Sequence, residues 1–405
     1  MNIVPALADS RPAVAQHTYE YNFEERPDLL QQKYNNETGL GTDNFRNSGE
    51  NAFSVKVPEG DYEVRVKVTG LQDGTRYLIF SEDRRVMSNI LEIGRGESQT
   101  LAFLVNVRNP QLATAEQDTA AGPRVGLRGD EDISRNWDDK LTIALSNNGV
   151  QFSQLRIEPV RKPKVLLAGD STVADQASQD YASWGQFVPG LIRNRVVVNH
   201  ARSGETLKSF LFSLRWDKLL SQTQAGDIVL IQFAHNDEKK QWPRTFAAAD
   251  GAFPEYLRAF VADVRQKEAI PVLVTPVARR IYNERGELLN THQGYDEAVR
   301  EVARATGVPV IDLTAQTTSF YQRLGQKEAK RAFAADGKDR THHNYYGAWM
   351  IANMVVNNLQ ALYPELIQSE NTVLDSTNPT RPGELVITSD LWPDMRPAAV
   401  EISGS

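Results

Sequence analysis

A serine, a histidine and an aspartate stand where they could work together as a nucleophile, a base and an orienting acid. Ser171 follows the apolar run 164–169, and Asp339 and His342 stand three residues apart far along the chain. A serine hydroxyl attacks an ester only when a base takes its proton, and histidine does this best when a carboxylate fixes its tautomer. We therefore predict that Ser171 is a nucleophile, His342 its base and Asp339 the partner of His342.

Acyl transfer also needs hydrogen-bond donors for the oxyanion of the tetrahedral intermediate. Three candidates are the backbone N–H of Ser171 at the start of a helix, the backbone N–H of Gly204 and the side-chain amide of Asn236. Glycine suits the second position because its backbone approaches a substrate without a Cβ in the way. The structural alternatives are a helix cap for Ser171 and an Asx turn for Asn236.

The elements that would position these residues alternate between apolar strands and amphipathic helices, a pattern typical of a parallel sheet covered on both faces. Strands are predicted at residues 164–169, 195–200, 227–233, 270–276 and 308–313. Helices are predicted at residues 184–194, 206–220, 254–268, 295–306 and about 345–362. Because ligands collect at the carboxyl ends of the strands in such sheets, Ser171, Gly204 and Asn236 should meet at one edge.

The residues before this region follow a different pattern. From residue 17 to residue 160, apolar and polar residues alternate in short runs that are separated by the turn-forming stretches PEGD, QDGT and SNNG. This pattern predicts an antiparallel β-sandwich, jelly-roll-like or galactose-binding-like, with a long loop over residues 108–135 that is either functional or mobile. Whether the sandwich binds glycan or is purely structural stays open.

The chain of 405 residues is long enough for two domains. We place the β-sandwich at residues 17–160, the catalytic domain at 164–363 and a tail at 364–405 that packs on the body or is partly disordered. Residues 1–16 lack an intact signal peptide, but their ALA and AVA patterns resemble those before signal cleavage sites. We interpret them as a leader remnant or a disordered segment.

The bulk composition excludes several classes of function. A net charge of −7 argues against binding to nucleic acid or to an anionic membrane, and no apolar run is long enough to span a bilayer. With no cysteine, the chain has neither disulfides nor a thiol nucleophile. The spacing of His235, His342 and His343 is not that of an HExxH metal site, so we expect no metal and no other cofactor.

Four blocks in this order resemble the SGNH (GDSL-like) hydrolase superfamily. They are GDS at residues 169–171, Gly204, HND at residues 235–237 and the D-x-x-H pair of Asp339 and His342. The stretches GDSTV, FAHNDEKK and DRTHHNYYGA look like those of rhamnogalacturonan acetylesterases, carbohydrate esterases of the family 12 type. One residue departs from the pattern, because Ala234 stands where the superfamily usually has glycine.

The resemblance implies a three-layer α/β/α sandwich around a five-stranded parallel, flavodoxin-like sheet. It assigns the nucleophile to Ser171, the base and its partner to His342 and Asp339, and oxyanion donors to Gly204 and Asn236. The implied reaction removes acetyl groups from a plant cell-wall polysaccharide, pectin or rhamnogalacturonan, by an enzyme that is secreted or periplasmic. The alternatives are an acetylxylan esterase, a lipase- or thioesterase-like hydrolase, and a non-catalytic carbohydrate-binding protein.

Four further residues are candidates for contacts with such a substrate. Trp184 could stack on a sugar ring, with burial in the core as the alternative. Arg202, Arg279 and Arg280 could bind a galacturonate carboxylate through the fork of the guanidinium group, as could Arg340. The structural alternative for each arginine is a solvated surface position.

Overall fold

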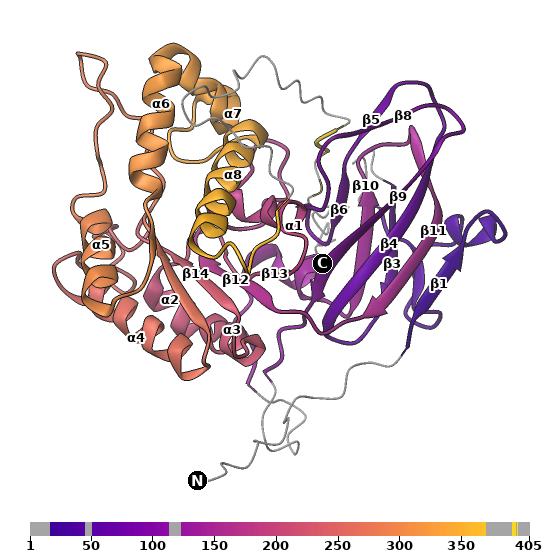
Figure 1. The fold of residues 1–405 in the computed structure, drawn as a ribbon, viewed down its shortest axis with the longest axis horizontal. Helices are drawn as coiled ribbons and strands as arrows, with labels where there is room; N and C mark the ends of the chain where they lie inside the picture. The colour runs from indigo at the N-terminus through magenta and orange to yellow at the C-terminus, as the bar shows by residue number, and fades with distance from the viewer. Residues whose placement is uncertain (1–16, 45–50, 113–122, 370–390, 394, 396–405) are drawn as a thin grey trace, which may run out of the picture.

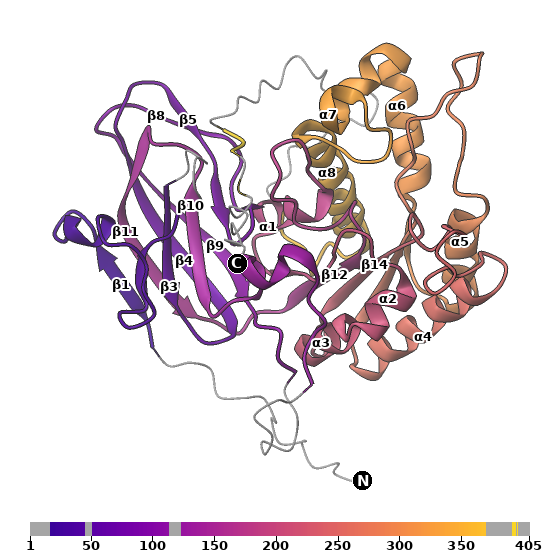
Figure 2. The same ribbon diagram turned by 180° about the vertical axis from the view of Figure 1, so that it is seen from behind.

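The computed structural model describes residues 17–44, 51–112, 123–369, 391–393 and 395. Two parts lie side by side, an all-β part formed by the first half of the chain and a part with helices and strands formed by the second half (Figures 1 and 2). The predicted leader remnant and most of the predicted tail lie outside the described residues.

The first part is a β-sandwich of two antiparallel sheets, as predicted. One sheet has the order β1-β11-β4-β9 and the other the order β2-β3-β10-β6-β7. The strands of the first sheet are β1 (Tyr19–Asn22), β4 (Gly60–Gly70), β9 (Ser98–Val107) and β11 (Val150–Pro159). Those of the second are β2 (Leu40–Thr42), β3 (Asn51–Lys56), β6 (Ile79–Ser81), β7 (Arg85–Val86) and β10 (Lys140–Leu145), and β5 (Thr75–Tyr77) pairs with β8 (Leu91–Ile93).

The alternation of residue types along β4 shows why the sandwich forms. Val64, Val66 and Val68 are buried between the sheets, while Arg65 and Lys67 point outward. Side chains alternate between the two faces of a strand, so this sequence buries one face and leaves the other to solvent.

The second part contains a five-stranded parallel sheet in the order β13-β12-β14-β15-β16, which is the flavodoxin-like order. The strands are β12 (Lys164–Gly169), β13 (Val196–Asn199), β14 (Ile228–Gln232), β15 (Ile270–Val274) and β16 (Val310–Ile311). All five predicted strands are present. Because β12 and β14 are adjacent, the residues that follow them emerge at the same edge of the sheet.

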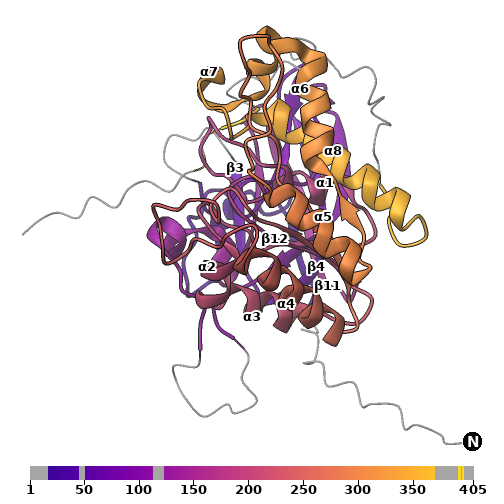
Figure 3. The ribbon, with the colours of Figure 1, turned by 90° about the vertical axis from the view of Figure 1, so that its left-hand side faces the viewer.

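Helices cover both faces of this sheet, which confirms the three-layer architecture (Figure 3). On one face, Val165 and Leu167 of β12 pack with α1 (Val188–Leu191) and α8 (Tyr345–Leu362). On the other, Leu166 and Ala168 pack with α2 (Leu207–Phe212), α3 (Arg215–Gln222), α4 (Ala252–Gln266) and α5 (Tyr295–Thr306). Burial on both faces explains why these strands are continuous apolar runs.

Three predicted elements differ from the structure. The helix expected at residues 184–194 is a short 3-10 helix, η4 (Trp184–Gln186), followed by the four-residue α1. The helix expected at residues 206–220 is divided into α2 and α3 at Leu214, whose φ of +61° is not helical. The strand expected at residues 308–313 ends early, and α6 (Leu313–Ala329) was not predicted. Asp312 explains this start, because its side chain accepts a hydrogen bond from the backbone N–H of Ala315 and caps the helix.

The two parts share a buried core. Leu78, Phe80 and Val86 of the sandwich belong to the same apolar cluster as β12 and α8. The described residues of the tail also join it, since the Trp392 ring stacks on Phe187 with the ring centroids 5.6 Å apart. The predicted loop at residues 108–135 contains one short 3-10 helix, η2 (Gly129–Ile133), and a second, η3 (Arg135–Trp137), begins at its last residue. Residues 113–122 lie outside the described residues.

Candidate active site

Ser171 lies in a tight turn at the carboxyl end of β12, not at a helix N-terminus as we expected. The carbonyl of Asp170 accepts hydrogen bonds from the backbone N–H groups of Val173 and Ala174. The Asp170 carboxylate also accepts from the N–H and the hydroxyl of Thr172, at 2.9 and 2.8 Å. Asp170 therefore braces the turn that presents Ser171.

The side chain of Asp170 is in turn bound by His235. One oxygen of its carboxylate lies 3.1 Å from His235 Nδ1, and both side chains are buried. Burial alone would raise the pKa of Asp170, but its interaction with His235 and the two hydrogen bonds from Thr172 outweigh burial, and the pKa of Asp170 is lowered. The buried carboxylate is therefore kept ionised directly beneath the turn.

The three residues predicted as a triad lie in contact. Ser171 Oγ lies 2.9 Å from His342 Nε2, and His342 Nδ1 lies 2.9 Å from Asp339 Oδ2. The other oxygen of Asp339 accepts hydrogen bonds from the backbone N–H groups of Thr341 and His342, at 2.7 and 2.9 Å. The histidine is thus held between a hydroxyl and a carboxylate, the geometry that nucleophilic ester hydrolysis requires.

The environment of Asp339 favours its ionised form. Partial burial opposes ionisation, but the hydrogen bonds from the two backbone N–H groups and from His342 are stronger, so the pKa of Asp339 is lowered. The His342 ring also contacts the Tyr181 ring in an edge-to-face arrangement, with the centroids 5.7 Å apart. The imidazole is therefore confined by an aromatic ring as well as by its hydrogen bonds.

Gly204 and Asn236 follow β13 and β14 at the same edge of the sheet. Gly204 has a φ of +82°, and a Cβ built on it would meet no atom within 4 Å, so its backbone faces open space. Asn236 is buried, and its amide nitrogen donates to the carbonyl of Glu205 at 3.0 Å. The residue next to Gly204 therefore contacts Asn236 directly.

Lys239 is a residue that our sequence reasoning missed. Its ammonium group donates to Asn236 Oδ1 at 2.7 Å and lies 4.6 Å from the centroid of the half-exposed Trp242 ring. With the oxygen bound by Lys239, the nitrogen of the Asn236 amide is turned toward Glu205. The only signal in the sequence is the three-residue spacing in the stretch HNDEKK.

Ala234 has a φ of +144°, a backbone conformation that costs little for glycine and strains any other residue. This is the position at which the sequence departs from the usual glycine. Ala234 is completely buried. The additional methyl group is therefore accommodated in the core rather than in open space beside Ser171.

The predicted substrate contacts have other partners. Trp184 is buried in the core and its indole N–H donates to Gln232 Oε1 at 3.0 Å, so the stacking prediction is wrong. Arg202 is bound by Glu131 and Arg279 by Glu238. Arg280 donates to the carbonyls of Gly337 and Asp339, at 2.6 and 3.2 Å, and so supports the loop that carries the triad carboxylate.

Arg340 and the remaining histidines complete the surroundings of the site. Arg340 is exposed and stands on the loop between Asp339 and His342. His343 is buried beside the Tyr321 hydroxyl, and burial lowers its pKa to about 3, which keeps it neutral. Over the described ranges, no three His, Asp or Glu side chains are grouped as metal ligands.

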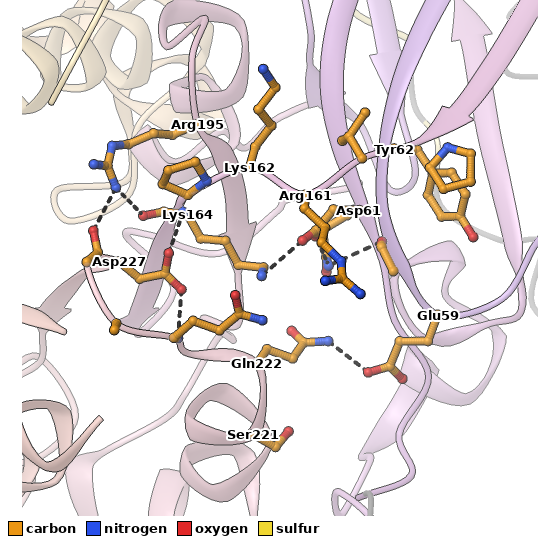
Figure 4. Close-up of a pocket in the computed structure, with 18 of the residues that line it drawn as sticks. Glu59, Asp61, Tyr62, Arg161, Lys162, Lys164, Arg195, Ser221, Gln222 and Asp227 are labelled. Carbon is orange, nitrogen blue, oxygen red and sulfur yellow. Dashed lines mark hydrogen bonds and ion pairs between the residues drawn. The ribbon is translucent and has the colours of Figure 1, made fainter. Parts of the chain in front are cut away.

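A cavity of about 850 Å³ lies at the opposite edge of the sheet, between the two parts (Figure 4). Its walls include the amino ends of strands, at Lys164, Asp227 and Ile270, and the sandwich residues Glu59 and Asp61. Ser171 follows the carboxyl end of β12, whereas Lys164 begins it. The cavity is therefore separate from the serine and histidine.

Comparison with known proteins agrees with this fold and places the chain in a family. Residues 167–350 match the model of the GDSL-like Lipase/Acylhydrolase family. The rhamnogalacturonan acetylesterase RhgT of Bacillus subtilis is 36% identical over 218 residues, which are 50% of this chain and 92% of that protein. The probable rhamnogalacturonan acetylesterase YesY of the same species is 32% identical over 51% of this chain and 96% of that protein.

A solved structure matches more of the chain. The protein YXIM_BACsu of Bacillus subtilis aligns with 82% of this chain and 93% of its own, with 21% identity and a TM-score of 0.50. This similarity extends the agreement in fold beyond the region that the family model covers.

The fold and the named relatives together define the class of this protein. The chain belongs to the GDSL-like lipase/acylhydrolase family, the SGNH hydrolases, and is a carboxylic ester hydrolase. Within that family it is rhamnogalacturonan acetylesterase-like. Among the described residues, no helix has the length and apolar character needed to cross a membrane.

Proposed function

We propose that this protein is a serine esterase that removes O-acetyl groups from plant cell-wall polysaccharide, pectin or rhamnogalacturonan, through an acyl-enzyme intermediate. The observation that carries the proposal is the continuous contact from Ser171 Oγ through the His342 ring to Asp339, at 2.9 Å on each side. This arrangement allows the histidine to take the serine proton while the carboxylate stabilises the imidazolium.

In the first half of the reaction, Ser171 Oγ attacks the carbonyl carbon of the acetyl ester and His342 Nε2 takes its proton. The oxyanion is held by the backbone N–H groups of Ser171 and Gly204 and by the N–H of the Asn236 amide that is not bound to Glu205. Collapse of the intermediate breaks the ester bond, and His342 gives the proton to the departing sugar oxygen, which leaves as a hydroxyl.

In the second half, a water molecule attacks the acetyl-serine and His342 takes its proton. The same donors hold the second oxyanion. Its collapse breaks the bond between Ser171 Oγ and the acetyl carbon, His342 returns the proton to Oγ, and acetate leaves. Each step needs only side chains and backbone groups of this chain. Asp339 remains ionised throughout, in line with the lowered pKa of its carboxyl.

The substrate class is supported by the relatives and by one surface feature. RhgT is named as a rhamnogalacturonan acetylesterase and YesY as a probable one. Lys239 connects Asn236 to the half-exposed ring of Trp242, which offers apolar surface of the kind that packs against sugar rings. Because the proposed substrate is a cell-wall polymer, we expect the enzyme to act outside the cytoplasm, either secreted or in the periplasm.

The test is acetate release from acetylated rhamnogalacturonan, homogalacturonan, xylan and mannan by the wild type and by Ser171→Ala. Ser221→Ala is the matched control, because Ser221 lines the remote cavity. We expect fastest release from a pectic substrate and a loss of more than about 10³-fold in Ser171→Ala only. Release by Ser171→Ala at the wild-type rate would remove Ser171 from the mechanism.

The same panel separates the alternatives. Preference for acetylated xylan would make the protein an acetylxylan esterase. Faster cleavage of nitrophenyl esters with acyl chains of eight or more carbons would indicate a lipase- or thioesterase-like enzyme. Binding to a polysaccharide without release of acetate from any ester would indicate a carbohydrate-binding protein.

A further inference from the structure

The long loop of the sandwich reaches the loop that carries Gly204. Glu131, in η2, accepts hydrogen bonds from Arg202 Nε at 2.5 Å and from Arg215 Nη2 at 2.6 and 2.5 Å. Arg202 also donates to the carbonyl of Arg128 at 2.9 Å. Because Arg202 stands two residues before Gly204, the chain segment that leads into this glycine is bound to the sandwich.

The residue after Gly204 is bound in the same way. Glu205 is completely buried and forms an ion pair with Arg128 of the sandwich. Its second carboxylate oxygen accepts from the Ser209 hydroxyl at 2.5 Å, and its backbone carbonyl accepts from the Asn236 amide at 3.0 Å. Sandwich residues therefore hold the chain on both sides of Gly204, and Glu205 links this anchor to Asn236.

The physical consequence follows from the freedom of glycine. Gly204 has a positive φ and no side chain, so only its neighbours restrict the direction of its N–H. An oxyanion donor is effective only when it already points at the place where charge develops. Three arginines and two carboxylates, fixed to one another by charged hydrogen bonds, supply that restriction.

The sandwich also reaches the loop that follows Ser171. Arg85 binds Asp175 at 2.9 Å, and Arg84 donates to the carbonyls of Ser178 and Tyr181 at 2.5 and 2.7 Å. Both arginines are buried, and Tyr181 is the residue whose ring meets His342. Two of the loops that form the site are thus anchored by the first part of the chain.

We propose that the β-sandwich is a positioning domain for the esterase site, and that Glu131 is the positioning residue that aims the Gly204 N–H at the oxyanion. The inference rests on the proposed function, since it takes Gly204 to be an oxyanion donor. It gives Arg128 and Glu131, in the described end of the long loop, a function in turnover.

The other edge of the sheet provides a matched control. Glu59, also from the sandwich, accepts from Lys218 of α3 at 2.8 Å through both carboxylate oxygens and from Gln222 at 2.9 Å. Figure 4 shows Glu59 and Gln222 at the wall of the remote cavity. Glu59 and Glu131 are thus carboxylates that join the same two parts, Glu59 at the wall of the remote cavity and Glu131 bound to Arg202, two residues before Gly204.

The experiment compares Glu131→Gln with Glu59→Gln in the full chain, using nitrophenyl acetate. We expect Glu131→Gln to lower kcat about 10- to 100-fold with KM within twofold, because a displaced donor weakens only transition-state binding. Glu59→Gln should keep kcat within twofold of the wild type, even though it loses the same kind of contact. Circular dichroism and thermal melting establish that both variants are folded.

A second variant and a second readout guard against a folding defect. If Glu131→Gln does not fold, Arg128→Ala takes its place. Arg128 is the ion-pair partner of Glu205, and its side chain is half exposed, so its loss disturbs the core little. We expect kcat to fall about 3- to 10-fold. Inactivation by a phosphonate ester, whose tetrahedral oxygen uses the same donors, should slow by the same factor as kcat/KM. The pH at which the rate rises should stay unchanged, because His342 and Asp339 are untouched.

Two results would overturn the inference: equal kcat values for Glu131→Gln and Glu59→Gln, or a loss in Glu131→Gln that lies entirely in KM. Ser171→Ala is measured alongside. If that variant keeps its activity, the proposed mechanism fails. The comparison of the two glutamate variants then still reports whether the sandwich controls turnover.

Discussion

The four loops that form the candidate site are held in two different ways. The loops after β12 and β13, which carry Ser171 and Gly204, are bound by arginines and a glutamate of the sandwich. The loop after β14 and the loop before α8 are held by their own part of the chain. Lys239 fixes Asn236, and Arg280 supports Asp339.

This difference teaches that one site can depend on two kinds of support. The Asp339 carboxylate and the oxygen of the Asn236 amide are held by contacts within the second part of the chain, although the amide nitrogen also contacts Glu205, which the sandwich binds. In our proposal, the direction of the Gly204 N–H depends on the docking of the sandwich. We therefore expect substitutions in the loops that carry Asn236 and Asp339 to impair proton transfer or oxyanion binding directly. Substitutions at the sandwich contacts should change the direction of the Gly204 N–H.

The largest effect is expected from Asp339→Asn in the internally supported pair. The Asn oxygen can still accept from the two backbone N–H groups, so its NH₂ faces His342 Nδ1 and forces the proton onto Nε2. In that tautomer His342 cannot take the Ser171 proton, and kcat should fall about 10³- to 10⁴-fold. The measurement is kcat for nitrophenyl acetate at pH 7.

Asp336→Asn is the control for this prediction. Asp336 is exposed, lies three residues before Asp339 and has a φ of +54°, which asparagine tolerates well. It should keep the wild-type kcat. A loss of less than tenfold in Asp339→Asn would mean that the carboxylate does not set the tautomer of His342.

A smaller effect is expected from Lys239→Met. This change removes the donor to Asn236 Oδ1, so the amide is free to turn, and kcat should fall about tenfold. Asn236→Ala, which removes the amide donor completely, should lower kcat about 10²- to 10³-fold. Lys240→Met is the matched control, because Lys240 is the exposed neighbour. Equal kcat values for the two lysine variants would remove Lys239 from the support of Asn236.

The smallest effect concerns the stability of the loop after β14. Burial raises the pKa of Asp237 from 3.8 to about 8. Between about pH 4 and pH 8 the unfolded chain therefore loses this proton while the folded protein keeps it, so the wild type loses stability as the pH rises. Asp237→Asn has no such proton, and its melting temperature relative to wild type should rise by about 3 °C or more from pH 5 to pH 8.

Thermal melting at pH 5, 6.5 and 8 checks this prediction, with Asp250→Asn as a control at an exposed carboxylate. A melting difference between Asp237→Asn and wild type that is the same at all three pH values would show that the buried carboxyl does not retain its proton in the folded state.

Much of the fold could be predicted from the sequence because its signals are local. The switch from alternating to continuous apolar runs separated the sandwich from the parallel sheet, and the residues that follow three strands gave Ser171, Gly204 and Asn236. The start of α6 was missed because the apolar run up to Leu313 continues past the end of β16, and the Asp312 cap was not recognised.

The substrate contacts could not be predicted for a different reason. The residue type of a tryptophan or an arginine indicates which ligands it can bind, but not whether its side chain already has a partner within the protein. Trp184 is occupied by the core and by Gln232, and Arg202 by a carboxylate 71 residues away. Such partners depend on how the two parts dock.

The sequence by itself determined the kinds of element, their order and the chemical groups at the strand ends, since these depend on residue type and on periods of two to four residues. Only the tertiary structure decided that His342 lies within reach of Ser171 and that Glu131 and Arg128 hold the chain around Gly204. Ser171 and His342 are 171 positions apart in the sequence. Glu131 and Arg128 are 71 and 77 positions from their partners Arg202 and Glu205. Folding of the parallel sheet and its helices brings the first pair together, and burial of the core shared by the sandwich and the sheet brings the other two together.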